Sequence, residues 1–383
     1  MTAGLPPAGL VSPKLRTAGP SEDLGLPAGT RIFSADSHLA LSEDIWFERF
    51  PASMKDRAPR VWLEDGMFQL GSRDRPLLAD QFKVALAEFD GVPGGQSDKI
   101  GLRLADLDAE GVDEELVFPS SVPVLFWYPD LEVRSLCFRI YNEYIAELQQ
   151  ASGGRFHGVG FINWWDPKGT RRSLAELHAL GIRTFLLPMK APAGIGSDLV
   201  DWTSAAMRPF WDEVEEAGLP VSHHIGEAPQ MTEVNPMPIG FVFNASSFRE
   251  MFSKYIFGGI LDRHPKLQVG WFEGGINWVV PAIQDAEHGY ASYRSTCNWK
   301  LAHDITWYWR THMVASFMLD PLGLELIDRI GTDRAMWSSD YPHNEGSFGY
   351  SRSAIRAVVD AVGRDVAAGI VGDNVRRFLG LNA

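Results

Sequence analysis

Eight short apolar segments alternate with stretches of helical periodicity along the chain, and this alternation restricts the fold more than any other feature. Eight β/α units predict a closed barrel of parallel strands, a (β/α)8 TIM-type barrel of the α/β class. An open doubly wound sheet is the alternative, but no glycine-rich phosphate loop follows the first segment. The predicted strands cover residues 32–36, 115–118, 156–162, 182–187, 219–225, 267–272, 313–317 and 335–339.

The chain divides into an N-terminal arm and one large domain. Residues 1–30 are rich in proline and glycine and lack a continuous apolar core, so they predict an extended arm rather than a secretory signal. Residues 31–383 are expected to form a single barrel. Within them, residues 39–96 carry many aromatic side chains among prolines and charges, which predicts a folded insertion over the active site.

The balance of charged residues restricts the kinds of molecule that the protein is expected to bind. The chain has 35 Lys+Arg and 49 Asp+Glu, a formal net charge of −14, which disfavours nucleic acid and anionic membranes. No segment has eighteen uninterrupted apolar residues, so no transmembrane helix is expected. The two cysteines, Cys137 and Cys297, form no CxxC pattern, and a reducing cytoplasm fits this usage best.

Polar residues at strand ends are the first candidates for a site, because the chemistry of such barrels lies at the carboxyl ends of the strands. The first strand ends in Asp36 and His38, which are two residues apart and therefore point to the same face. A carboxylate and an imidazole together suit a divalent ion such as Zn²⁺, Mn²⁺ or Fe²⁺. Taken alone, the tripeptide also fits a loop in which Asp36 caps the next helix.

Three later strands also end in polar residues. On the fifth, His223 and His224 must point to opposite faces, and His224 is the favoured ligand. The sixth ends in Glu273 before two glycines, which leave room for a ligand. The eighth ends in Asp340, and a rigid Tyr-Pro turn holds His343 nearby. Singly, these residues are also explained as core histidines, salt-bridged carboxylates or helix caps; together, four strand ends predict one metal site.

These landmarks resemble amidohydrolase family 2 of the amidohydrolase superfamily, which includes aminocarboxymuconate-semialdehyde decarboxylase and resorcylate-type decarboxylases. The resemblance covers roughly residues 30 to 380. Of its motifs, the Ser-Asp-Tyr-Pro-His run that ends at His343 is specific by itself. The landmarks lie at residues 34–38, 104–113, 218–224, 262–267, 272–278, 337–343 and 372–380.

The resemblance implies a distorted (β/α)8 barrel with one bound divalent metal ion. Carried over by position, its ligands are Asp36, His38, His224 and Asp340. Zn²⁺ is the expected ion, with Mn²⁺ or Fe²⁺ as alternatives; an Asp-x-His pair, where family members have His-x-His or Glu-x-His, favours Mn²⁺. The resemblance, together with aromatic residues expected to be exposed in the 39–96 and 291–311 regions, also favours a homodimer.

One departure from the family bears on the reaction. In its characterised decarboxylases the sixth strand usually ends in a histidine, a candidate proton donor, whereas this chain has Glu273. The leading hypothesis is therefore a hydrolase in which metal-activated water attacks a carbonyl-type substrate. Asp340 or Glu273 would relay the proton, and His343 would orient the substrate or stabilise its oxyanion. Substrate contacts are predicted from His223, Arg60, Trp62 and Trp278.

Two alternatives stay open. The first is a non-oxidative decarboxylase or related lyase acting on an aromatic or unsaturated carboxylic acid, with Arg60, Arg73 or Arg75 as partners of the substrate carboxylate. The second is a catalytically inactive binding barrel, although the presence of all four predicted ligands argues against it. In each enzymatic case the expected partner is a small molecule.

Overall fold

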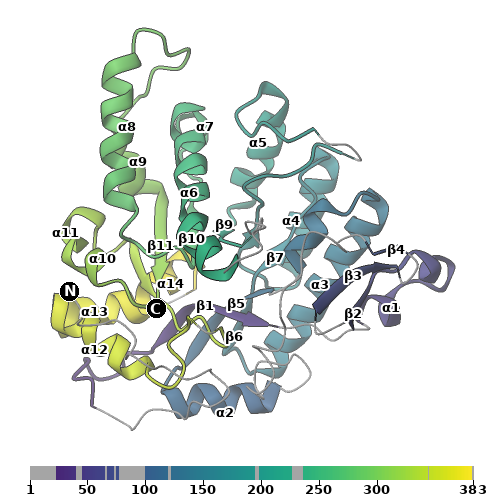
Figure 1. Ribbon diagram of the computed structural model, residues 1–383, viewed down its shortest axis with the longest axis horizontal. Helices are drawn as coiled ribbons and strands as arrows, with labels where there is room; N and C mark the ends of the chain where they lie inside the picture. Colours follow the sequence, from purple (N-terminus) through teal and green to yellow (C-terminus); the bar gives the residue numbers. More distant parts are fainter. Residues whose placement is uncertain are drawn as a thin grey trace.

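Parallel strands form the wall of an α/β barrel in the computed structural model, as the sequence predicts (Figure 1). The structure describes residues 23–39, 45–64, 67–72, 75–76, 100–119, 122–194, 198–226, 236–343 and 345–381. The wall strands are β1 Phe33–Leu39, β5 Glu114–Pro119, β6 Phe156–Gly158, β7 Gly160–Phe161, β8 Phe185–Leu186, β9 Val221–His224, β10 Val269–Phe272, β11 Met313–Phe317 and β12 Ala335–Trp337. Every predicted strand has a counterpart, and the third appears as two pieces, β6 and β7.

Two seams distort this barrel. The strands form one sheet of order β1-β5-β6 and another of order β12-β11-β10-β9-β8-β7. At the first seam the backbone changes partner, because the Val159 N–H donates to β5 and the Gly160 N–H donates to the residue before β8. At the second seam, a parallel bridge between Ser37 and Tyr341 joins β1 to the residues that follow β12. The first and last strands therefore meet and close the wall.

Helices surround the wall, and their buried faces join the strands in one continuous apolar core. Local sequence sets several of their ends. Asp130 and Asp166 each accept two backbone N–H groups at the start of a helix, and Gly218, with φ of 67°, ends another. The helices are α2 Ile100–Glu110, α3 Leu131–Ala151, α4 Pro167–Ala179, α5 Arg208–Ala217, α6 Pro236–Phe257, α7 Ile260–Arg263, α8 Val279–Tyr293, α9 Ile305–His312, α10 Pro321–Glu325, α11 Ile327–Ile330, α12 Ser351–Val362, α13 Arg364–Ala368 and α14 Asn374–Phe378. Within the described ranges, no helix is both long and apolar enough to cross a membrane.

The predicted insertion contains a small antiparallel sheet. Its described elements are the helix α1 Ile45–Arg49, a 3-10 helix Ala52–Arg57, and the strands β2 Arg60–Glu64, β3 Met67–Ser72 and β4 Arg75–Pro76. The sheet lies at the periphery of the barrel (Figure 1). Residues 40–44, 65–66, 73–74 and 77–99 lie outside the described residues, so coverage of the active site by the insertion stays a prediction.

The predicted arm is described only at its C-terminal end. Residues 1–22 lie outside the described residues. Leu24 is buried, and Arg356 of α12 donates to the carbonyl oxygen of Leu24 at 3.2 Å and also to that of Asp23. The chain at residues 23–24 is therefore fastened to α12.

Candidate metal centre

β1 carries two of the predicted ligands on one face. The strand extends to Leu39, beyond its predicted end at residue 36, and its pairing with β5 shifts register between Ser34 and Ser37. The side chains of Asp36 and His38 are buried, and His38 Nε2 lies 3.6 Å from Asp36 Oδ1. Both side chains point to the same face, as expected for residues two apart on a strand.

β9 brings a second imidazole to the same place. His224 Nε2 lies 3.4 Å from Asp36 Oδ2, and His224 Nδ1 donates to the Ile225 carbonyl oxygen at 2.7 Å. Because a carbonyl oxygen only accepts, Nδ1 carries the hydrogen, and Nε2 of the neutral ring keeps a lone pair directed at the cluster. The ring of Phe118, at the end of β5, packs against His224 with 4.7 Å between centroids.

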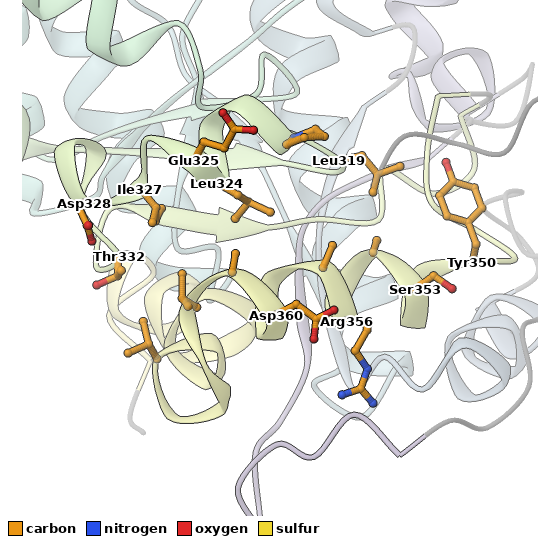
Figure 2. A pocket seen from close by; sticks show the side chains of 16 residues that line it. Leu319, Leu324, Glu325, Ile327, Asp328, Thr332, Tyr350, Ser353, Arg356 and Asp360 are labelled. Atoms are coloured by element: carbon orange, nitrogen blue, oxygen red, sulfur yellow. The ribbon is translucent and has the colours of Figure 1, made fainter. Parts of the chain in front are cut away.

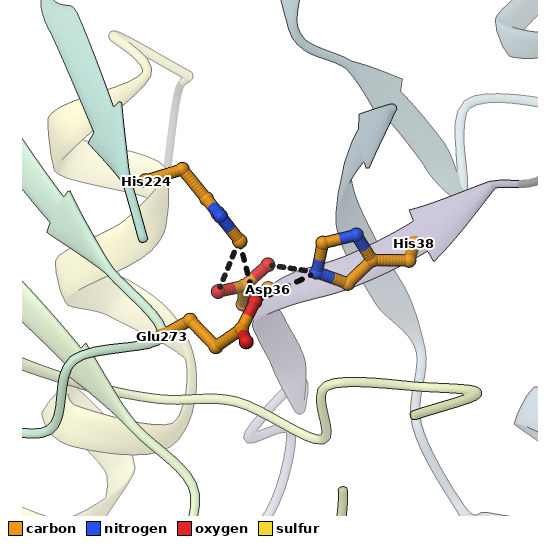
Figure 3. Close-up of side chains that lie close together, drawn as sticks. All are labelled: Asp36, His38, His224 and Glu273. Carbon is orange, nitrogen blue, oxygen red and sulfur yellow. Dashed lines mark hydrogen bonds and ion pairs between the residues drawn. The ribbon is translucent and has the colours of Figure 1, made fainter. Parts of the chain in front are cut away.

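Glu273 and Asp340 complete the cluster from the ends of β10 and β12. Glu273 Oε2 lies 2.9 Å from His224 Nε2 and 3.1 Å from His38 Nε2, and Asp340 Oδ1 lies 3.2 Å from His38 Nε2. Figure 3 shows Asp36, His38, His224 and Glu273 converging on one point from three strands. Three carboxylates and two imidazoles therefore meet at the carboxyl ends of the barrel strands.

The backbone is strained at both of these carboxylates. Among the described residues, Glu273 and Asp340 are the non-glycine residues with positive φ, at 67° and 51°. Such conformations cost of order 1–3 kcal/mol each and persist where the surroundings enforce them. The Glu273 N–H donates to Ser316 Oγ at 3.0 Å, and the Asp340 N–H donates to the Asp36 carbonyl oxygen at 2.9 Å. These bonds hold the strained residues so that their carboxylates face the cluster.

The pKa values in the cluster reflect crowded negative charge in a buried place. Burial raises the pKa of Asp36. Burial alone would lower the pKa of His224, but the neighbouring Asp36 and Glu273 carboxylates outweigh it and raise this pKa well above its ordinary value. Burial would raise the pKa of Glu273, but His224 outweighs it and lowers this pKa well below the usual range. The cluster thus needs positive charge, which either protons or a metal cation supply.

The donor atoms fit a cation. Both carboxylate oxygens of Asp36 and of Asp340, and Nε2 of His224, are buried without a hydrogen-bond partner among the described residues. Buried polar atoms normally have partners, so this group of atoms is typical of a cation-binding site. Asp36, His38, His224 and Glu273 offer ligand atoms that all lie within 4.8 Å of one another, and so do His38, Glu273, Asp340 and His343. The residues therefore fit a divalent ion, and Glu273 joins the four ligands named from the sequence.

The substrate contacts predicted from His223 and Trp278 do not lie at this cluster. His223 places Nδ1 2.8 Å from the Leu187 carbonyl oxygen and Nε2 2.8 Å from the Tyr255 hydroxyl. Burial lowers the pKa of His223 to about 3, so it is a neutral histidine of the barrel wall. Trp278 is buried and donates to the Gly275 carbonyl oxygen at 3.0 Å, so it serves packing. The polar atoms of both residues are engaged inside the protein, and their contact with a substrate stays a prediction.

The other two predicted substrate contacts lie in the small sheet. Arg60 on β2 places its guanidinium 3.7 Å from the centroid of the Phe47 ring. Trp62 is on the same strand, and its side chain is outside the described residues, as are the side chains of Arg73 and Arg75. Contacts of these residues with a substrate stay predictions.

Sequence reasoning missed a buried arginine behind the cluster. Arg103 of α2 donates through Nη1 to the His38 carbonyl oxygen at 2.7 Å, and through Nη2 to Glu115 Oε2 at 2.9 Å. Both side chains are fully buried. The available signal was Glu115 itself, because a carboxylate at the start of an apolar strand needs a buried cation. Arg103 thus fixes the backbone of His38, a predicted metal ligand.

A parallel barrel with carboxylates and imidazoles at its carboxyl ends defines a metal-dependent (β/α)8 barrel enzyme. Residues 99–381 match the amidohydrolase family Amidohydro_2, and the chain belongs to this family. Because the match begins at residue 99, Asp36 and His38 are placed in the site by their geometry alone. No curated protein matches the sequence.

Solved structures share the fold at low sequence identity. An amidohydrolase from Mycobacterium avium subsp. paratuberculosis K-10 has a TM-score of 0.69 at 17% identity, over 93% of this chain and 99% of that one. The 2,6-dihydroxybenzoate decarboxylase from Rhizobium has a TM-score of 0.64 at 17% identity, over 92% and 99%. A 5-carboxyvanillate decarboxylase from Novosphingobium aromaticivorans DSM 12444, complexed with manganese and 4-hydroxy-3-methoxy-5-nitrobenzoic acid, has a TM-score of 0.66 at 16% identity, over 97% and 100%.

Proposed function

We propose that the protein is a metal-dependent, non-oxidative decarboxylase that acts on an aromatic carboxylic acid. The observation that carries this proposal is the convergence of three carboxylates and two imidazoles on one point at the barrel rim. The decarboxylases of 2,6-dihydroxybenzoate and 5-carboxyvanillate that share the fold support it. Decarboxylation therefore takes precedence over the hydrolysis that the sequence favoured.

Mn²⁺ suits the proposed ligands better than the Zn²⁺ expected from the sequence. Carboxylate-rich sites suit Mn²⁺, whereas zinc sites are usually tetrahedral and richer in nitrogen or sulfur. The 5-carboxyvanillate decarboxylase with the same fold was crystallised with manganese. When bound, the ion would supply positive charge to hold the carboxylate of the substrate and a neighbouring oxygen.

Groups of the chain itself would orient the acid. His343 places Nδ1 3.0 Å from Asp340 Oδ1, and its ring stacks on His38 with 3.8 Å between centroids. Burial lowers the pKa of His343, but the Asp340 carboxylate outweighs this and raises the pKa to about 10. A cationic His343 would attract the substrate carboxylate. Phe118, packed against His224, would give one side of the cluster an apolar wall.

Decarboxylation also needs a proton donor. Loss of carbon dioxide breaks the bond between ring carbon and carboxylate, and the electron pair stays on the ring carbon, which then takes a proton. Glu345 lies two residues after His343, and burial, together with the charge of Asp340, raises the pKa of Glu345 to about 7. A carboxyl group with this pKa is partly protonated near neutral pH, so Glu345 can supply the proton. Glu345 would thus be the proton donor, a role for which the characterised decarboxylases of the family have a candidate histidine at the position of Glu273.

The Glu345→Gln variant is expected to lower kcat/KM by about 100-fold or more, because the proton donor is lost. Since the protonated form is the active one, kcat/KM of the unmodified enzyme should be constant at low pH and fall about tenfold per pH unit above the pKa of Glu345. This pKa is about 7 in the metal-free chain, and a cation on Asp340 lowers it, because the cation offsets the negative charge that raises it. The variant should lack this decline. Initial rates measured from pH 5 to 9 test both points, with the exposed Glu216→Gln as a matched control. An unchanged profile in Glu345→Gln would remove Glu345 from the mechanism.

Hydrolysis is the second candidate, and the pair of Asp340 and His343 favours it. A carboxylate 3.0 Å from an imidazole can hold a proton taken from water. The two reactions leave different products, because hydrolysis places an oxygen atom of water in the product and decarboxylation releases carbon dioxide.

The test of the function uses manganese-loaded protein with 2,6-dihydroxybenzoate and with 5-carboxyvanillate. Mass spectrometry is expected to find one carbon dioxide released per acid consumed, and in D₂O one deuterium at the vacated ring position. Oxygen from ¹⁸O-labelled water in the product, without carbon dioxide, would favour hydrolysis. Binding of both acids without any product would favour the inactive barrel. The homodimer and the cytoplasmic location stay predictions, and light scattering of the purified protein measures the first.

A further inference from the structure

A groove lies outside the barrel, between α10–α11 and α12. It encloses about 910 Å³, and Figure 2 shows its two walls with the side chains between them. None of its lining residues belongs to the metal cluster. The groove has an apolar floor, and exposed carboxylates stand on both of its walls. The floor includes Leu319, Leu324, Ile327, Ala354, Ala357 and Val366. Glu325 and Asp328 belong to the α10–α11 wall, and Asp360 belongs to the α12 wall.

The described chain begins beside α12, which forms one wall of the groove. Arg356 of α12 lines the groove and donates to the carbonyl oxygens of Asp23 and Leu24. Figure 2 shows the guanidinium of Arg356 on the side of α12 that faces away from α10–α11. Leu24 is only 5% exposed, so the chain is held there by packing as well as by hydrogen bonds. The 22 residues that precede Asp23 therefore start beside α12, one helix width from the groove.

The composition of residues 1–22 complements the groove. The segment contains two basic residues, Lys14 and Arg16, and one acidic residue, Glu22. Its larger apolar residues include Leu10, Val11 and Leu15. An extended chain advances about 3.3 Å per residue, so Arg16, seven residues before Asp23, can reach about 23 Å. This reach is longer than α12, whose twelve residues rise about 18 Å.

We propose that residues 1–22 of the same chain dock in the groove between α10–α11 and α12. The apolar residues of the segment cover the apolar floor, and Lys14 and Arg16 pair with the carboxylates of the two walls. α12 begins eight residues after His343 in sequence, so a docked segment also braces the loop that carries Asp340 and His343. A second copy of the chain is the competing occupant, and the test separates the two.

Photocrosslinking in the full-length protein tests this docking. A benzophenone amino acid at position 15 is expected to crosslink within the same chain to residues 324–328 or 354–366. Mixing isotope-labelled and unlabelled protein distinguishes this result from crosslinks between copies. Crosslinks only between copies, only to other surfaces, or none at all would overturn the proposal.

Matched variants sharpen the test. Ala357→Trp fills the groove and should reduce the crosslink yield roughly fivefold or more, whereas Ala175→Trp on the exposed face of α4 should not. Reversing the charges of Lys14 and Arg16 to Glu should reduce the yield roughly fivefold, because two surface ion pairs are lost. Adding Asp328→Lys and Asp360→Lys to that variant should restore it. A failure of both the groove-filling and the charge-swap effects would contradict the assigned groove, whether or not the enzyme decarboxylates its substrate.

Discussion

Replacing Asp340 by alanine is expected to abolish turnover and metal binding together. Asp340 is fully buried, and its Oδ1 lies 3.2 Å from His38 Nε2 and 3.0 Å from His343 Nδ1. Changes to groups that merely support metal ligands already weaken metal binding by about 10- to 100-fold, so loss of a ligand should cost more than about 100-fold. Elemental analysis of protein purified without chelators, combined with initial rates, measures both effects.

Two control variants distinguish loss of the metal ligand from a change in backbone conformation. Asp340 has a φ of 51°, a region that asparagine tolerates better than alanine. Asp340→Asn should therefore fold better than the alanine variant and still lose metal and activity, because its amide carries no charge. Asp365→Ala, at an exposed carboxylate on α13, should change neither. Full activity or an unchanged metal content in Asp340→Ala would contradict the assignment of this ligand.

Replacing Arg103 by methionine should lower the free energy of unfolding by about 3–5 kcal/mol. Arg103 and Glu115 form a fully buried ion pair, and loss of one partner leaves the other charge uncompensated. The same change removes the hydrogen bond to the His38 carbonyl oxygen, so metal affinity should also fall by about 10-fold or more. Urea denaturation followed by tryptophan fluorescence, and titration with Mn²⁺, measure the two effects.

A double-mutant cycle identifies the cause. Arg103→Met combined with Glu115→Leu removes both charges and should recover much of the stability, because no buried charge is left alone. Recovery of metal affinity is not expected, since the His38 carbonyl bond stays lost. Arg49→Met removes an exposed pair with Glu147 and should cost less than about 1 kcal/mol. If Arg103→Met costs no more than this control, the buried pair does not stabilise the fold.

Periodicity predicted the barrel because it reports burial directly. The eight apolar segments became the wall strands, with boundary errors of a few residues such as the end of β1. The same period of two explains why His224 reaches the cluster and His223 does not, since neighbouring residues on β9 face opposite sides. The sequence of each strand was therefore sufficient to predict which of its end residues face the cluster.

Contacts between distant segments could not be predicted in this way. Nothing in the sequence near Arg103 indicates that it bonds to the backbone of His38, 65 residues away. The left-handed backbone of Glu273, which turns its carboxylate toward the histidines, depends on Ser316 of the neighbouring strand. Such contacts depend on how neighbouring segments are aligned in the folded barrel, and a single sequence contains little information on this alignment.

The seam between the first and last strands has a consequence for biosynthesis. The Asp340 N–H bonds to the Asp36 carbonyl oxygen, and the His38 N–H bonds to that of Tyr341, at 2.9 and 2.6 Å. Predicted ligands on the first and last strands are thus joined by the bonds that close the barrel. A nascent chain on the ribosome therefore cannot bring the predicted ligands of β1 and Asp340 together before residue 341 has left the exit tunnel.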